Sequence, residues 1–174
     1  KITYPWTTEA GFGAVAVDGS HEYDPAGAIY AGYTGEELAK RVSELRDYVA
    51  ARTARVRGGT GYPELRSHEV LLVDDGIATG YTMRVAARFL RRLAPARLYV
   101  ATPTANPEAA AFVAELVDGL LVLNMRRGPP FAVADAYLEW HDVSDEELEE
   151  YMREAIEKGV ACPWLPRLGE PGGA

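Results

Sequence analysis

A chain of 174 residues with 48% hydrophobic residues is long enough to bury one core, and it contains no apolar run of membrane-spanning length. The formal net charge of −8 argues against nonspecific nucleic-acid binding, although it does not exclude an anionic small substrate. The single cysteine, Cys162, excludes an internal disulfide and is consistent with a reducing, cytoplasmic compartment.

The N-terminal third is predicted to hold a strand, a polar connection and a long helix. Residues 13–17 are predicted as a strand that ends in an Asp-Gly-Ser turn, and residues 21–33 are polar and weakly patterned. Thr34 to Glu37 has the pattern of a capping box, and apolar residues then recur at helical spacing, which predicts a helix over about 35–55. Its other face is basic and includes Lys40, Arg41, Arg52 and Arg55.

The most informative stretch runs from Glu69 to Thr82. An apolar run of strand length ends at two carboxylates, Asp74 and Asp75, and a loop of small residues then leads into a helix from about Thr82 to Leu93. The backbone N–H groups of such a loop, with the positive end of a helix behind them, can hold a phosphate. The paired carboxylates can accept hydrogen bonds from a diol or bind Mg²⁺ directly or through water.

The chain continues with alternating strands and helices. Strands are predicted at 97–103 and 119–124, and between them Asn106 caps a helix that begins at Pro107 and extends to about Val117. This alternation predicts an α/β fold with a doubly wound parallel sheet, and Thr102, Pro103 and Thr104 then fall at the carboxyl end of a strand, where they could line the site. A second capping box at Ser144 begins a helix over about 144–158.

The segment Val70–Thr82 resembles the phosphoribosyl pyrophosphate motif of the type I phosphoribosyltransferases. The resemblance implies a Rossmann-like domain over residues 1–159, with a small hood at about 125–142, followed by an extended tail at 160–174. It implies that Asp74 and Asp75 contact the ribose hydroxyls. It also assigns the 5-phosphate to the loop of Ile77, Ala78, Thr79, Gly80, Tyr81 and Thr82.

The same resemblance implies an activity. A phosphoribosyltransferase transfers the phosphoribosyl group of phosphoribosyl pyrophosphate to a nitrogen acceptor, typically a nucleobase, and releases pyrophosphate. The family resemblance also implies Mg²⁺ as cofactor, with Asp74 and Asp75 as possible metal contacts, and a homodimer as the assembly.

Three further residues are candidates by position. Lys1 matches a lysine that ends a strand in one branch of the family and can reach the pyrophosphate, or it is an exposed terminal lysine. If the match holds, the first strand, first helix and pyrophosphate loop of the family precede Lys1, so we expect a longer native chain and exposed apolar surface beside the missing strand. Arg57 lies in a Gly-rich loop that matches the mobile catalytic loop, or in a plain connection. Phe131 is the candidate to stack on a planar acceptor.

The loop departs from the pattern of the enzymes that salvage 6-oxopurines. Those enzymes carry an Asp at the position of Ala78, and alanine cannot transfer a proton. A purine enzyme is therefore disfavoured and the acceptor stays open. Two other classes also stay open: a regulator that binds phosphoribosyl pyrophosphate without turnover, and, more weakly, a nucleic-acid-binding relative that would use the basic face of the long helix.

Overall fold

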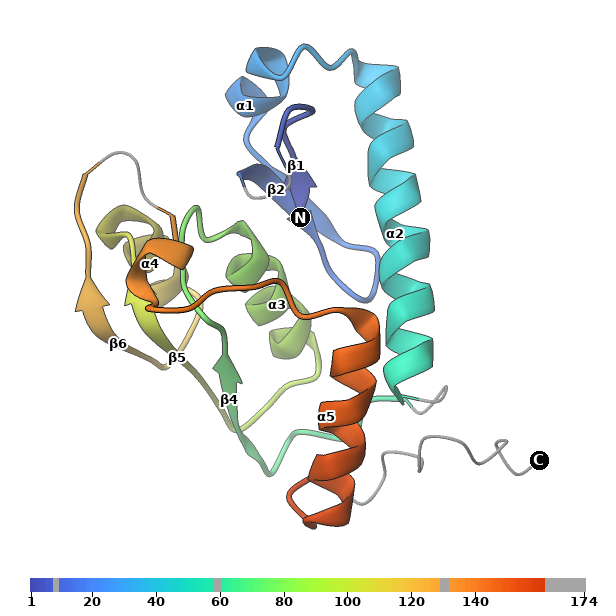
Figure 1. Ribbon diagram of the computed structural model, residues 1–174, viewed down its shortest axis with the longest axis vertical. Coiled ribbons are helices and arrows are strands. Elements are labelled where there is room, and N and C mark those ends of the chain that lie inside the picture. Colours follow the sequence, from blue (N-terminus) through green and yellow to red (C-terminus); the bar gives the residue numbers. More distant parts are fainter. Residues whose placement is uncertain (8–9, 58–60, 129–131, 162–174) are drawn as a thin grey trace.

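The computed structural model describes residues 1–7, 10–57, 61–128 and 132–161, which form two small sheets and the helices around them (Figure 1). The N-terminal sheet is antiparallel and has the order β1-β2-β3, and the second sheet is parallel and has the order β4-β5-β6. In the described part of the chain, no helix has both the length and the apolar composition that crossing a membrane requires.

The N-terminal sheet is a hairpin extended by a short first strand. β1 (Ile2–Thr3) pairs with β2 (Gly11–Val15), and β2 pairs with β3 (His21–Tyr23) through the predicted Asp-Gly-Ser turn. Gly19 has a φ of 79° in this turn, and the Asp18 carboxylate accepts a hydrogen bond from the Ser20 N–H. The predicted strand therefore exists, two residues earlier than expected, and a further strand follows it.

Two helices follow the hairpin. The weak pattern of residues 21–33 predicts no helix there, but the structure contains α1 (Pro25–Tyr30), whose start is capped by the Asp24 side chain. The long helix α2 (Gly35–Arg57) is confirmed, and so is its capping box, because Thr34 and Glu37 exchange backbone hydrogen bonds through their side chains. Ile2 and Phe12 pack with Leu38 and Val42 of α2 in the core under this sheet.

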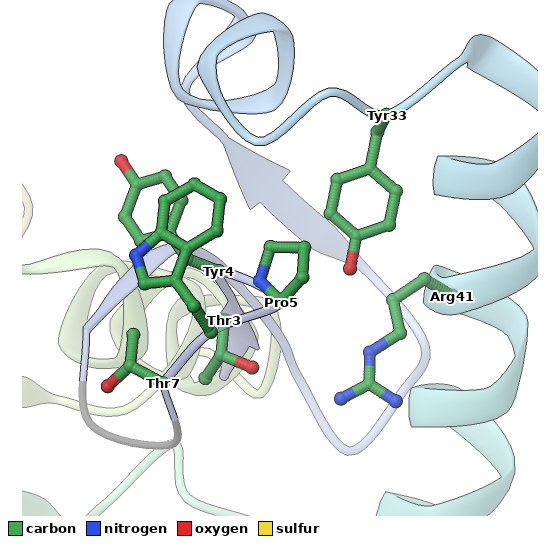
Figure 2. Close-up of a pocket in the computed structure, with 7 residues that line it drawn as sticks. Thr3, Tyr4, Pro5, Thr7, Tyr33 and Arg41 are labelled. Carbon is green, nitrogen blue, oxygen red and sulfur yellow. The ribbon is translucent and has the colours of Figure 1, made fainter.

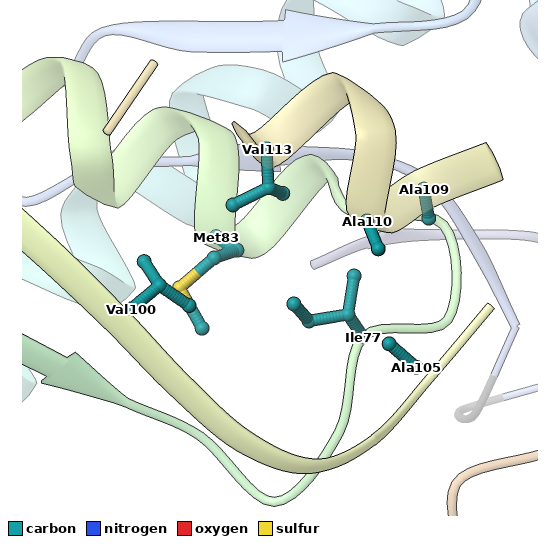
Figure 3. Close-up of a cluster of buried hydrophobic side chains, with 7 residues drawn as sticks. All are labelled: Ile77, Met83, Val100, Ala105, Ala109, Ala110 and Val113. Carbon is teal, nitrogen blue, oxygen red and sulfur yellow. The ribbon is translucent and has the colours of Figure 1, made fainter. Parts of the chain in front are cut away.

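The predicted parallel α/β unit is confirmed. Its strands are β4 (Glu69–Val73), β5 (Arg97–Ala105) and β6 (Gly119–Met125), joined by α3 (Tyr81–Arg92) and α4 (Pro107–Ala114). Both helices pack against the same face of the sheet, over the main apolar core (Figure 3). That core consists of Ile77, Met83, Val100, Ala105, Ala109, Ala110 and Val113. Asn106 caps α4 as expected, with its side chain accepting from the Glu108 and Ala109 N–H groups.

A short ion-pair network fixes α3 to the hairpin. The Glu22 carboxylate lies between the Arg84 and Arg88 guanidinium groups, and both the Glu22 and Arg84 side chains are only 19% exposed. The Arg84 guanidinium also lies over the rings of Tyr81 and Phe112. Because α3 begins directly after the loop of interest, this network determines where that loop sits relative to the N-terminal sheet.

The C-terminal helix α5 (Asp145–Glu157) is held at its first turns by charge. Its capping box between Ser144 and Glu147 is complete. Asp145 pairs with Arg52 and Arg55 of α2, and Glu149 also pairs with Arg55. These arginines belong to the basic face that sequence reasoning considered for nucleic acid, so part of that face is neutralised within the chain.

The opposite face of the parallel sheet is apolar and exposed in the described residues. Because side chains alternate along a strand, one face carries a set of large apolar residues that are each more than half exposed. This apolar sheet face consists of Leu71, Val73, Leu121, Leu123 and Met125.

We expect the 174-residue chain to self-associate through the apolar sheet face, because contiguous apolar patches of this kind drive association. Leu123→Lys should lower the apparent mass in light scattering at high protein concentration. Leu138→Lys is the matched control, since Leu138 is fully exposed but lies in a different part of the chain. Equal association of the parent and Leu123→Lys would contradict this prediction.

Candidate functional site

One buried residue, Ile77, fixes the loop after β4 to the rest of the fold. Ile77 is 2% exposed, its N–H donates to the Thr104 carbonyl (3.0 Å), and its carbonyl accepts from the Asn106 N–H (2.8 Å). These bonds tie the middle of the loop to the carboxyl end of β5. The residues on either side of Ile77 therefore stand at the edge of the sheet where parallel α/β proteins bind ligands.

The loop ends at a helix start that no side chain caps. Gly80 has a φ of 81°, a conformation that favours glycine, and a Cβ there would lie 3.3 Å from the Ala109 carbonyl oxygen of α4. Ala78, Thr79 and Thr82 are exposed around this turn. The first N–H groups of α3 thus have no capping side chain, and an anion could accept hydrogen bonds from them.

The two carboxylates occupy different environments. Asp74 is half-buried, whereas Asp75 is exposed, and the Asp75 N–H donates to Oδ1 of Asp74 (3.1 Å). Burial raises the pKa of the Asp74 carboxyl, the negative charge of Asp75 raises it further, and the Asp75 N–H and the charge of Lys1 partly oppose these effects.

Asp74 should make the unliganded fold less stable at neutral pH. Because its folded-state pKa is raised, the folded chain holds the Asp74 proton more tightly than the unfolded chain does. Below the unfolded pKa, about 4, Asp74 is protonated in both states, and its burial does not lower the free energy of unfolding. As pH rises through the folded pKa, the buried carboxyl ionises and this stability is lost. We expect Asp74→Asn to raise the melting temperature at pH 7 and to change it little at low pH.

Thermal denaturation of the parent and Asp74→Asn across this pH range tests the prediction. Asp47→Asn is the control, because Asp47 is exposed and lies in α2, outside the site. If Asp74→Asn melted at or below the temperature of the parent at pH 7, the burial of Asp74 would not strain the fold.

Two residues of the predicted hood, Val133 and Tyr137, pack beside the acid pair. Gly76 lies against Val133, because a Cβ on Gly76 would meet the two Val133 γ-carbons at 2.5 and 2.7 Å. The Tyr137 hydroxyl donates a hydrogen bond to the Asp75 carbonyl (2.7 Å). Desolvation raises the pKa of Tyr137, and the negative charges of Asp75 and Asp74 raise it further. Between Val133 and Tyr137 lies a 3₁₀ turn, Ala134–Ala136. The Tyr137 side chain therefore contacts the backbone of the acid pair from 62 positions away.

The two pyrophosphate candidates line one cavity. Lys1 and Arg57 both border a cavity of about 430 Å³ between the hairpin and α2, together with Arg52. The Arg57 guanidinium lies 4.1 Å from the centre of the Tyr62 ring and donates to the Gly61 carbonyl (2.8 Å). The structure therefore brings together two cations that are 56 positions apart in the sequence, and Lys1 links this cavity electrostatically to Asp74.

Other candidates have different places from those expected. The Tyr81 ring packs against Ala14, Ala16 and Val85, so Tyr81 offers the loop its backbone rather than its hydroxyl. Thr102 and Thr104 are buried, so they support the loop and do not line an open site, although Pro103 is exposed. Phe131, the predicted stacking residue, lies outside the described residues.

The fold and this site together define a class: an α/β protein with a strand, an acid pair and a loop leading to an uncapped helix start at the carboxyl edge of a parallel sheet. A sequence model of the phosphoribosyl transferase domain matches residues 29–124, which is more than half of the chain. The chain therefore belongs to the phosphoribosyl transferase family, as the motif indicated.

Relatives agree with this assignment. The chain is 26% identical over 160 residues to "Putative phosphoribosyl transferase Rv0571c" of Mycobacterium tuberculosis, and the match covers 89% of this chain and 35% of the relative. The chain thus spans about a third of the length of the curated relatives it matches. Among solved structures, TT1426 from Thermus thermophilus has a TM-score of 0.61 and 29% identity, covering 88% of this chain and 72% of that one.

Proposed function

We propose that the chain binds phosphoribosyl pyrophosphate with Mg²⁺ and transfers its phosphoribosyl group to a nitrogen acceptor, releasing pyrophosphate. The observation that carries the proposal is the acid pair, Asp74 and Asp75, placed directly before an uncapped helix start at Gly80. A ribose 5-phosphate needs both features, because its phosphate accepts hydrogen bonds and its two hydroxyls donate them.

The roles of the residues follow from their positions. The N–H groups from Ala78 to Thr82 bind the 5-phosphate, supported by the dipole of α3. The carboxylates of Asp74 and Asp75 accept from the ribose hydroxyls and hold the sugar in one orientation. Lys1 and Arg57, which line one cavity, supply positive charge for the pyrophosphate as the bond to the sugar breaks.

The carboxylates also suit a hard divalent cation, since oxygen ligands are those that Mg²⁺ prefers. No cluster of three or more His, Cys, Asp or Glu side chains that could hold a metal occurs in the described ranges. A magnesium ion would therefore depend largely on the phosphate oxygens of the substrate, with Asp74 and Asp75 as contributing ligands. When bound, it would neutralise charge on the leaving pyrophosphate.

The acceptor is proposed to be a nucleobase that needs no proton transfer from the loop. Ala78 is exposed in the loop and has no titratable group, so any proton on the acceptor nitrogen must leave by another route. This same observation favours the second candidate, a regulator that binds phosphoribosyl pyrophosphate without turnover. We also propose a homodimer and a cytoplasmic location, which the family resemblance implies.

A pyrophosphate-release assay separates the two functions. The protein, phosphoribosyl pyrophosphate and Mg²⁺ would be incubated with each of a panel of nucleobases. Release with at least one base, absent from Asp74→Asn/Asp75→Asn, would establish the transferase. Saturable binding of the donor without release in the presence of any base would instead favour the regulator. Size-exclusion chromatography with light scattering tests the homodimer. A dimer that persists in Leu123→Lys does not depend on the apolar sheet face.

A further inference from the structure

A second cavity, of about 750 Å³, lies between the N-terminal loop and the start of α2. It is lined by none of the residues of the Asp74–Thr82 segment, and its volume is typical of small-molecule sites. Its lining combines aromatic rings, four hydroxyl-bearing side chains and a single cation. The lining residues are Thr3, Tyr4, Pro5, Trp6, Thr7, Tyr33 and Arg41.

One wall of this cavity is a preformed aromatic shelf. The Trp6 and Tyr4 rings are stacked, with centroids 5.3 Å apart and planes within 16° of each other. The Tyr30 ring meets both edge-on, at 5.8 and 5.6 Å, and so fixes their orientation. Trp6 is nevertheless 60% exposed. A rigid indole with much of its surface in water offers a flat apolar area to another ring.

The opposite wall is polar. The Tyr33 hydroxyl and the Arg41 guanidinium point into the same space, across from Pro5 (Figure 2). Arg41 contacts Glu44 at 3.7 Å, and both side chains are more than one-third exposed, so this ion pair is weak. A carboxylate in the cavity could therefore form a bidentate pair with the guanidinium at little cost.

We propose that this cavity binds a planar aromatic carboxylic acid, with its ring on the Trp6 shelf and its carboxylate on Arg41. The shelf selects a flat ring over an aliphatic one, and the single cation selects an acid over its neutral amide. Tyr33 is placed to donate a further hydrogen bond to the carboxylate. The site is independent of the proposed function, because its residues are not those that we assign to phosphoribosyl pyrophosphate.

The test uses Trp6 as its own reporter. The chain has three tryptophans, so Trp140→Phe/Trp164→Phe leaves Trp6 as the only indole. Benzoate is the probe, and benzamide and cyclohexanecarboxylate are its neutral and non-aromatic counterparts. We expect saturable quenching by benzoate, and affinity at least about tenfold weaker for each counterpart and for Arg41→Gln in the same background, a loss of about 1.4 kcal/mol.

Two variants control for charge and folding. Arg66→Gln removes an exposed arginine that also pairs with a glutamate and should leave benzoate affinity unchanged. Arg41→Lys keeps the positive charge but loses the two parallel N–H donors of the guanidinium, so this variant should bind benzoate with intermediate affinity. Quenching that does not saturate, or equal affinity for benzoate and benzamide, would overturn the proposal. A parallel titration with phosphoribosyl pyrophosphate and Mg²⁺ shows separately whether the proposed function holds.

Discussion

Asp74→Asn/Asp75→Asn is expected to weaken the binding of phosphoribosyl pyrophosphate at least tenfold, or about 1.4 kcal/mol. The amides keep the shape of the two side chains but remove the negative charge that accepts hydrogen bonds from the ribose hydroxyls. Their N–H₂ groups also turn part of each acceptor into a donor. Calorimetric titration of the donor with Mg²⁺ into the parent and the double variant measures the difference.

The control for this result is Asp47→Asn, which removes an exposed carboxylate of α2, outside the site. It should bind the donor like the parent, so that a general loss of negative charge cannot explain the effect. Thermal denaturation of the double variant under the titration conditions shows separately that it is folded. Unchanged affinity in the double variant would remove the acid pair from the proposed site.

Gly76→Ala is expected to destabilise the fold by about 1–3 kcal/mol, the usual cost of overpacking. The new Cβ would lie 2.5 and 2.7 Å from the Val133 γ-carbons and 3.0 Å from Cγ2 of Thr104. Val133 is short and branched, so the hood itself must move. Since Tyr137 holds the same hood to Asp75, donor affinity should fall together with stability.

A double-mutant cycle isolates this contact. Val133→Ala removes both clashing carbons, so Gly76→Ala/Val133→Ala should recover most of the loss caused by Gly76→Ala. Gly35→Ala is the matched control, because nothing lies within 4 Å of its Cβ position. Denaturant unfolding and donor titration give both readouts. If the two substitutions were additive, the hood would not pack on Gly76 in solution.

The parallel unit and the helices α2 and α5 were predictable because their signals are local and agree with one another. The apolar run of β4, the Asn106-Pro107 cap and the two capping boxes each mark an element, and the structure has all of them at nearly the expected places. The acid pair and the uncapped turn at Gly80 follow from the register of one strand, one loop and one helix. The sequence therefore locates this part of the candidate site.

The remaining features depend on contacts between distant residues. α1 is only six residues long, and its signal, Asp24 before Pro25, is short enough to be taken for a turn. Tyr137 reaches Asp75 across 62 positions, and Lys1 shares a cavity with Arg57 only because α2 passes beside the hairpin. The aromatic shelf likewise joins Trp6 to Tyr30, which no periodicity links.

The central claim is that the loop of Asp74 to Thr82 binds the ribose phosphate end of phosphoribosyl pyrophosphate. Its most direct test is calorimetric titration of that compound, with Mg²⁺, into the parent chain, compared with ribose 5-phosphate and pyrophosphate separately. We expect saturable binding of the intact donor with a stoichiometry near one site per chain, weaker binding of ribose 5-phosphate, and binding of both at least about tenfold weaker in Asp74→Asn/Asp75→Asn. No heat of binding from either sugar phosphate, in a chain that melts cooperatively, would contradict the account.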